Sequence, residues 1–160
     1  MISVTVIALG KMKESYMRQF AAEYEKRLKT MCKLNVIELT PVSLPDNPSE
    51  KQIDAALDAE AVKISEKIPS GSYVLSLCIE GKQKSSEELA EMFGSVALKG
   101  LSSIVFIIGS SFGLSEKIKI GSNERISMSR MTFPHQMARV MLLEQIYRAF
   151  SINAGSKYHK

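Results

Sequence analysis

Apolar residues along the chain are arranged in two ways: in continuous runs, or spaced so that one recurs at every third or fourth position. Continuous runs predict buried strands, whereas spaced runs predict helices with one apolar face. The strands predicted in this way are residues 2–9, 34–39, 73–79, 104–108 and 125–128. Helices are predicted between them, with a short helical turn after Gly113. This alternation indicates an α/β fold with a mostly parallel sheet flanked by helices.

Three of the predicted helices carry further signals. The first has an aromatic and aliphatic residue at every fourth position, which predicts one inward face: Tyr16, Phe20, Tyr24 and Leu28. The second follows a loop with three prolines at residues 40–48 and is marked by Ile53, Leu57, Ala61, Ile64 and Ile68. Ser85 and Glu88 form a capping-box signature at the start of the third.

The last helix, expected from Pro134 onward, is apolar almost all the way round. One side carries Ala138, Leu142, Leu143, Ile146, Ala149 and Phe150, with Arg139 among them. A helix of this kind is buried on two sides. Because one domain of this size rarely encloses a helix completely, we expect the second side to meet another subunit in a two-fold homodimer.

Two polar residues of that helix have alternative interpretations. Arg139 needs an anionic or carbonyl partner; it forms either a structural ion pair, for instance with Glu144, or a contact with an anion or RNA. His135 either titrates as an acid or base near neutral pH or caps the start of the helix, and we prefer the structural role.

The composition is that of one globular domain spanning residues 1–160, with 45% apolar and 24% charged residues. Cys32 and Cys78 are isolated, so neither a disulfide framework nor a zinc site is expected. The apolar run at the start has no basic segment before it, and no run reaches membrane-spanning length. We therefore expect a cytoplasmic protein without a metal ion or a membrane partner.

The net charge of +4 is unevenly distributed. Lys and Arg outnumber Glu between Lys11 and Lys33 and again between Arg130 and Lys160, whereas acids predominate in between. Two basic ends that meet in space would suit a polyanion, although solvated helix faces explain such runs more often. The terminal Tyr158, His159 and Lys160 would suit nucleic-acid contact if ordered, and otherwise form a frayed tail.

Three turns are candidates for ligand binding, because ligands of parallel sheets bind beyond the carboxyl ends of the strands. They are residues 80–82, 109–113 and 127–133. The glycines at both ends of the second turn allow a ligand to approach the main chain, but a tight turn without a ligand has the same pattern. Neither a Rossmann nor a Walker motif is present.

These motifs together resemble a known family. The turn from Gly109 to Gly113 after VFIIG, the stretch SMSRMTFPHQMARVMLLEQIYRAF and the terminal Tyr-His-Lys resemble the ribosomal large-subunit methyltransferase H family of the SPOUT superfamily. The opening VIALGKMKESYMRQFAAEYEKRL and the LxxEGK segment that begins at Leu77 match it as well. The likeness covers essentially the whole chain.

The resemblance implies a cytoplasmic homodimer that transfers a methyl group from S-adenosylmethionine to N3 of a pseudouridine in 23S rRNA. The implied substrate is the assembled 70S ribosome, with no DNA or membrane partner, and the implied fold has a C-terminal trefoil knot. Two alternatives stay open: action on tRNA or another rRNA position, and a non-catalytic ribosome-binding factor.

The resemblance also implies roles for particular residues. The cofactor would be surrounded by Leu77, Gly109, Met128, Ser129, Arg130, Met131, Thr132 and Phe133. His159 or a nearby water would take the N3 proton, while Tyr158, Lys160 and Arg139 would hold the RNA within or across the dimer interface. Lys11, Lys13 and Arg18, taken as part of the N-terminal helix, are expected to contact rRNA phosphates. Ser110 departs from the pattern, because the family usually has a second glycine there.

Overall fold

The computed structural model describes residues 1–160 and contains the expected alternation of strands and helices. The strands are β1 (Ser3–Leu9), β2 (Lys33–Leu39), β3 (Tyr73–Gln83), β4 (Ser103–Ile108) and β5 (Glu124–Ser127). The helices are α1 (Ser15–Leu28), α2 (Glu50–Ser65), α3 (Ser86–Leu98), α4 (Glu116–Gly121) and α5 (His135–Asn153). The predicted α/β class is confirmed, although β3 runs past its predicted end at residue 79.

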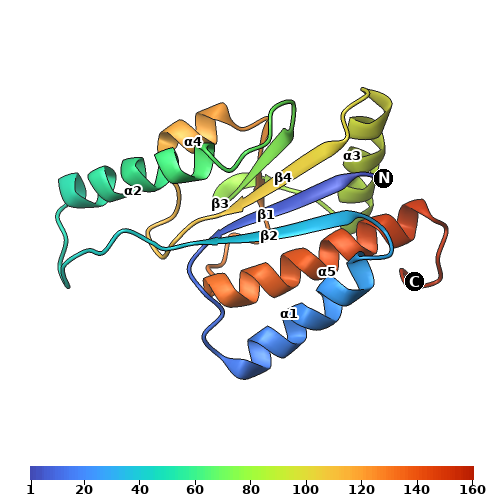
Figure 1. Cartoon of the computed structure of the whole chain (residues 1–160), viewed down its shortest axis with the longest axis horizontal. Coiled ribbons are helices and arrows are strands. Elements are labelled where there is room, and N and C mark those ends of the chain that lie inside the picture. The colour runs from blue at the N-terminus through green and yellow to red at the C-terminus, as the bar shows by residue number, and fades with distance from the viewer.

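The strands form one five-stranded sheet in the order β2-β1-β4-β3-β5, and every pairing is parallel. All five strands therefore end at the same edge of the sheet. In Figure 1 the labelled strands point away from the side where the N-terminus lies, and α5 runs back toward that side. This arrangement places the turns that follow the strands at one edge and the C-terminus away from it.

Helices cover both faces of the sheet. Successive side chains of a strand point to opposite faces, so Val4 and Val6 of β1 pack in the larger core cluster, whereas Ile7 and Leu9 pack in a second one. The larger cluster includes residues of α1, α3 and α5, and the second includes residues of α2 and α4. Figure 1 shows α1 and α5 on one side of the sheet and α2 and α4 on the other.

Two helices of the same chain pack against α5, and the subunit interface expected on this helix stays a prediction. Within one chain α5 lies against both α1 and α3, so these two helices already cover much of its apolar surface. The exposed apolar residues of this helix pair are Tyr16 and Phe20 of α1, which are 64% and 54% exposed, and Met137 of α5, which is 38% exposed. The face of α1 that points inward is marked by Ala21 and Leu28. The prediction of one inward face from Tyr16 to Leu28 is therefore wrong for its first half.

Local signals at other elements match the structure. The capping box of α3 is confirmed, since the Glu88 amide donates to Ser85 Oγ at 3.1 Å and the Ser85 amide donates to Glu88 Oε2 at 2.7 Å. Cys32 and Cys78 are free thiols. None of the helices combines the length and the hydropathy that a bilayer span requires. The threading of the last helix through a knot stays a prediction.

Candidate functional site

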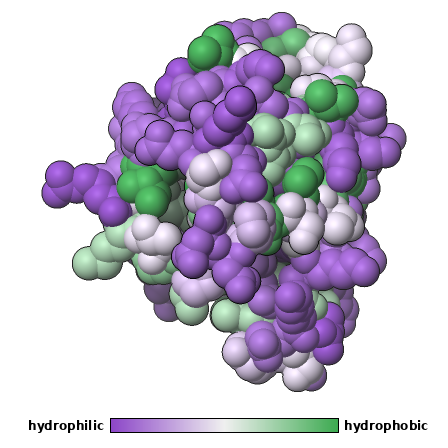
Figure 2. Space-filling model, turned by 90° about the vertical axis from the view of Figure 1, so that its left-hand side faces the viewer, coloured by the Kyte–Doolittle hydropathy of each residue, from purple (hydrophilic) through white to green (hydrophobic).

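Leu77 lies level with the end of β4 and at the point where the pairing of β3 with β5 is interrupted. It is aligned with Ile108 of β4 on one side and with Ile126 of β5 on the other. One residue beyond Ile108 is Gly109, and the segment 128–133 follows β5 directly. The structure thus brings together the residues that the sequence proposed for cofactor contact. Figure 2 looks onto this edge of the molecule, where small apolar patches are separated by hydrophilic side chains.

An excursion of β3 shapes one border of this site. Both Leu77 and Lys82 align with Ile126, so the residues between them leave the ladder and return. A β-carbon on Gly81 would lie 2.6 Å from the carbonyl carbon of Ile126, which leaves room for glycine only. Glu80 in the excursion accepts from Lys119 Nζ at 2.5 Å, and this interaction lowers the pKa of the Glu80 carboxyl. The excursion is therefore a fixed structure.

The glycine turn after β4 is held just as closely. The Gly113 amide donates to the Ser110 carbonyl at 2.9 Å, and Gly113 has a φ of 86°, in the region that favours glycine. A β-carbon on Gly109 would collide with the Gly113 carbonyl oxygen. Glycine is therefore required at the two positions for different reasons. Gly113 has a backbone conformation that favours glycine, and Gly109 allows two backbone segments to approach closely.

The segment 128–133 has a main chain whose amides are largely unpaired. Ser127 Oγ donates to the Ser129 carbonyl at 2.8 Å, and Ser129 Oγ accepts from the Met131 amide at 3.0 Å, which orders the turn. Other amides of the segment donate to no group of the protein, namely those of Ser129, Arg130, Thr132 and Phe133. Met131 is 74% exposed. The turn thus offers backbone donors and an apolar side chain to a ligand.

Arg139 connects the start of α5 to the far side of the sheet. Its guanidinium donates to Glu38 Oε2 and to the Gly10 carbonyl, both at 2.8 Å, and its side chain is only 3% exposed. The structural ion pair considered for Arg139 is confirmed, but its partner is Glu38 rather than Glu144, which accepts from Arg148. In the single chain Arg139 thus has structural partners and is covered from outside.

His135 lies beside the same junction. A β-carbon on Gly10 would be 3.2 Å from its Nε2, so the ring packs over the Gly10 backbone. Burial, together with the positive charges of Arg139 and Lys13, lowers the pKa of the imidazole. The residue at the N-cap of α5 is Pro134, and no side chain caps the helix. The prediction that His135 caps the helix is therefore wrong, and its role here is packing.

The N-terminal basic residues do not all lie on a helix. Lys11 and Lys13 are exposed and precede α1, which begins at Ser15. Arg18 lies on α1 and donates to the carbonyls of Met12 and Lys13, at 3.0 and 2.6 Å. The prediction that all three residues lie on the helix is wrong, and Arg18 holds the loop that carries the two lysines.

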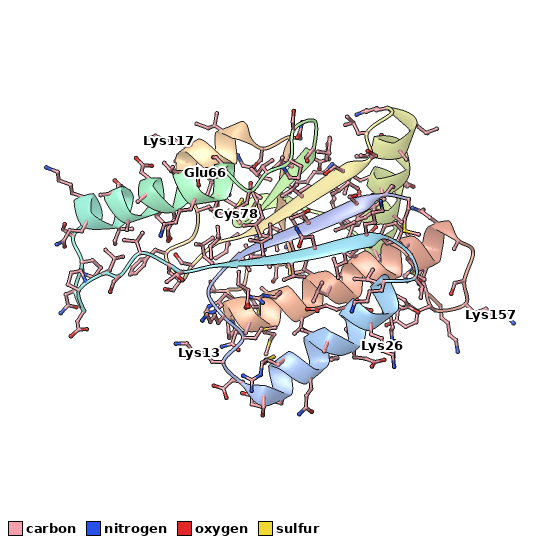
Figure 3. The ribbon with its side chains drawn as sticks, in the orientation of Figure 1. Lys13, Lys26, Glu66, Cys78, Lys117 and Lys157 are labelled. Atoms are coloured by element: carbon pink, nitrogen blue, oxygen red, sulfur yellow. The ribbon has the colours of Figure 1, made fainter.

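The C-terminal tail is docked, so the frayed-tail interpretation is wrong. The Tyr158 hydroxyl donates to Glu144 Oε1 at 3.1 Å, and its ring lies edge-on to Tyr147 with centroids 4.7 Å apart. Burial and the contact with Glu144 raise the pKa of Tyr158. Figure 3 shows Lys157 and Lys13 at opposite ends of the layer formed by α1 and α5, so these basic segments do not form one patch.

His159 has a partner at each ring nitrogen. Nδ1 lies 3.2 Å from Arg148 Nη1, and Nε2 lies 2.8 Å from Glu87 Oε1. Because a guanidinium can only donate, Nδ1 is the acceptor and Nε2 carries a proton that it donates to Glu87. This contact lowers the pKa of the Glu87 carboxyl to about 2.

Tyr158 and His159 do not meet the three turns of their own chain. No hydrogen bond of either residue reaches Leu77, Gly109 or residues 128–133. Glu144, the acceptor of the Tyr158 hydroxyl, lies nine residues beyond His135, which corresponds to about 13 Å of helix rise, and Arg148, the partner of His159, lies further along the same helix. Within one chain, Tyr158 and His159 are therefore apart from the three turns, although the sequence analysis assigned both groups to a common site.

One buried carboxylate was missed by the sequence analysis. Glu60 of α2 is 3% exposed and accepts a hydrogen bond from Ser110 Oγ at 3.2 Å. Its spacing from Leu57 and Ile64 places it on the apolar side of the helix, which is the signal that could have identified it. Glu38 carried no such signal, because its partner Arg139 lies far away in the sequence.

The chain is similar to known proteins over nearly its whole length. A family model described as a predicted SPOUT methyltransferase matches residues 2–159. The ribosomal RNA large subunit methyltransferase H of Clostridium novyi (strain NT) is 48% identical over 159 residues, covering 99% of this chain and 100% of that protein. Proteins of the same name from Bacillus cytotoxicus and Clostridioides difficile (strain 630) are also 48% identical, with the same coverage.

A solved structure supports the fold. The chain resembles a probable methylase family protein from Haemophilus influenzae Rd KW20, with a TM-score of 0.52 and 17% sequence identity. The match covers 99% of this chain and 70% of that one. At this identity the likeness concerns the fold alone.

Proposed function

The chain belongs to the SPOUT methyltransferase family, and from this premise we propose that it methylates N3 of a pseudouridine in 23S rRNA with S-adenosylmethionine as the methyl donor. The relatives are named for large-subunit ribosomal RNA, which supports the class of substrate. The nucleotide, the assembled 70S ribosome as substrate and the cytoplasmic location belong to the proposal.

The meeting of three turns at one sheet edge is the observation that carries the proposal. Leu77 lies level with the end of β4, and Gly109 follows that strand directly. The amides after β5 that donate to no group of the protein are those of Ser129, Arg130, Thr132 and Phe133. Such amides suit the ring nitrogens of adenine and the methionyl carboxylate, and Met131 and Phe133 suit its apolar parts. The donor set therefore fits S-adenosylmethionine, which supplies an electrophilic methyl group on a sulfonium sulfur when bound.

The protein's own part in the reaction is positioning and proton transfer. The lone pair of N3 is delocalised into two carbonyls, so the N3 proton must leave before or during methyl transfer. His159 or a water beside it would take the proton, and Tyr158 and Lys160 would hold the RNA. Because Nδ1 is the nitrogen with the free lone pair and it accepts from Arg148, the base role requires that the tail exchange Arg148 for RNA.

A homodimer would unite the two groups of residues. Tyr16 and Phe20 of α1 are exposed, and Met137 at the start of α5 is 38% exposed, on two helices that pack together. Apolar residues exposed on adjacent elements favour a subunit interface. We propose that the tail of one subunit reaches the three turns of its partner, since the tail cannot contact those of its own chain in the docked position.

Lys11 and Lys13 are proposed to contact rRNA phosphates. They are exposed and lie beside the start of α5, where the Lys13 amide donates to Gln136 Oε1 at 3.1 Å. Through this bond the loop is fixed near the end of the segment 128–133. Arg139 is assigned to the same region as a residue that holds the loop, through Gly10, rather than one that touches RNA.

The alternatives differ in substrate or in chemistry. The cofactor site would be the same for another RNA target, because the residues proposed at the sheet edge contact the cofactor and do not define the target base. A non-catalytic ribosome-binding factor would have lost the methyl donor, and Ser110 in the glycine turn is the one feature that favours it.

Nucleoside mass spectrometry on cells that lack the gene tests the proposal. The 23S rRNA of these cells should lack 3-methylpseudouridine, and a plasmid copy of the gene should restore it. A copy with Gly109→Ala should not restore it. A normal level of 3-methylpseudouridine together with the loss of a tRNA methylation would assign the enzyme to tRNA. No change in any RNA would favour the binding factor.

A further inference from the structure

A buried carboxylate supports the glycine turn from behind. Glu60 lies on α2, whereas the face of the turn proposed for the cofactor adjoins β3 and β5. Ser110 Oγ donates to Glu60 Oε1 at 3.2 Å, and Glu60 is 3% exposed. A carboxylate so deeply buried is stable only with hydrogen-bond partners. The contact with Ser110 is therefore a structural tie rather than a surface encounter.

Glu60 also faces the loop that precedes α2. Glu60, Ser110 and Val42 of that loop line the same cavity. Burial is the largest influence on the Glu60 carboxyl and raises its pKa, and the hydrogen bond from the Ser110 hydroxyl opposes this shift. Ser110 is thus the donor that stabilises the buried carboxylate.

Ser110 transmits this tie to the glycines on either side of it. It follows Gly109 directly, and its carbonyl accepts from the Gly113 amide at 2.9 Å. Because Gly109 and Gly113 are also in close contact, a shift of Ser110 would move both glycines. The other end of the turn is fixed separately, since Ser115 Oγ donates to Asp58 Oδ1 at 2.7 Å.

Packing gives the turn little other support on this side. A cavity of about 300 Å³ lies between the proline-rich loop and the turn, and Val42, Ser110 and Phe112 are among its lining residues. Phe112 is 47% exposed. Without the tie to Glu60, the turn would border open space and could relax into it.

We propose that Glu60 and Ser110 are positioning residues of the methyl-donor site, which act through the hydrogen bond between them to hold Gly109 in its binding conformation. This inference rests on the proposed function for its ligand, S-adenosylmethionine. The serine hydroxyl gives the turn of this chain an anchor on α2. Glycine at the same position could not provide one, because it has no side chain.

Two measurements on Ser110→Ala, Glu60→Gln and the double variant test the proposal. In the unliganded protein, NMR hydrogen exchange of the Gly113 amide should become about tenfold faster, as expected when a hydrogen bond to a charged group is lost. The Kd for S-adenosylmethionine from calorimetry should rise about tenfold, with kcat changed far less than KM. The double variant should match Ser110→Ala, because Glu60→Gln only weakens a bond that the loss of the hydroxyl already removes.

Controls separate a positioning role from a general structural one. Ser110→Thr retains the hydroxyl and should keep the parental exchange rate and Kd. Glu66→Gln makes the same chemical change at an exposed position at the end of α2 and should alter neither. Ser110→Ala decides the question if Glu60→Gln does not fold.

Parental exchange and Kd in Ser110→Ala would overturn the proposal, as would effects of the two single variants that multiply in the double variant. A parent protein that binds no S-adenosylmethionine would refute the proposed function instead. In that case the exchange of Gly113 would still decide whether the tie holds the turn.

Discussion

Arg139 and Glu38 form an ion pair that fastens the start of the last helix to the end of β2, with Nη1 and Oε2 2.8 Å apart. The guanidinium also donates to the Gly10 carbonyl, so it fixes the loop after β1 at the same time. The pair therefore connects three elements that lie far apart in the sequence. It sets where α5 begins, directly after the segment proposed to bind the cofactor.

Arg139→Ala should lower the free energy of unfolding by about 3 kcal/mol, because the buried guanidinium makes two hydrogen bonds, to Glu38 and to the Gly10 carbonyl, and both are lost. Urea unfolding measures this change. Lys117→Ala breaks an exposed pair with Asp58 and should change the free energy of unfolding by less than about 0.5 kcal/mol. Equal small effects in both variants would show that the Arg139 junction does not hold the fold.

Gly109→Ala should weaken S-adenosylmethionine binding more than tenfold, because the added β-carbon collides with the Gly113 carbonyl and forces the turn open. Titration calorimetry measures the affinity. Gly94→Ala in α3 has open space around it and should raise stability by about 0.5–1 kcal/mol without changing the affinity. Tight binding by Gly109→Ala would mean that the cofactor lies elsewhere.

Stability should depend on the ionisation of His135. Its pKa in the folded protein is lowered from the ordinary value of 6.5, so the unfolded chain binds the proton more tightly. The neutral ring makes its full contribution to the free energy of unfolding above pH 6.5. This contribution is lost as the pH falls from 6.5 through the lowered pKa. Urea midpoints between about pH 7.5 and about pH 5 should therefore fall less in His135→Gln than in the parent. If the urea midpoints of both proteins fell equally with pH, the stabilising role of neutral His135 would be contradicted.

Mixed dimers should reveal whether the tail acts on the partner subunit. One variant carries Gly109→Ala, and the other ends at Gly155 and lacks Tyr158 and His159. Each should be inactive alone. Random reassortment of equal amounts makes half of the dimers mixed, and each mixed dimer has one complete site, so about a quarter of the parental methyl transfer should return. No recovery would place both parts of the site in the same chain.

Lys11→Glu with Lys13→Glu should weaken ribosome binding and make it less dependent on salt, because two phosphate contacts are lost. Binding would be measured by sedimentation at several salt concentrations. Lys117→Glu reverses a charge on α4, on the other side of the sheet, and should leave binding unchanged. Equal losses in both variants would indicate a general charge effect.

The sequence predicted the elements and the turns well, because both depend on local patterns. Continuous apolar runs identified the strands, and the glycines of the turn after β4 marked a close approach that the structure explains at Gly109. Contacts between distant residues were not predictable in this way. Nothing near Glu38 indicates Arg139 as its partner, since 101 residues separate them.

The spacing of apolar residues also did not predict which residues of α1 are exposed or that the C-terminal tail is docked. The fourfold spacing that starts at Tyr16 suggested one buried stripe, but a helical stripe drifts around the axis, and the structure buries Ala21 while Tyr16 and Phe20 stay exposed. The order of the strands depends on long crossovers. The docked tail depends on Glu87 and Glu144, which give no local sign that they accept from His159 and Tyr158.

Methyl transfer to ribosomes tests the central claim most directly. S-adenosylmethionine with a tritiated methyl group would be incubated with the protein and with 70S ribosomes, 50S subunits or naked rRNA that lack the modification, followed by nucleoside analysis. Label in 3-methylpseudouridine from 70S ribosomes alone is the predicted result. Absence of label from all three RNAs, with protein that binds S-adenosylmethionine, would contradict the assignment to ribosomal RNA.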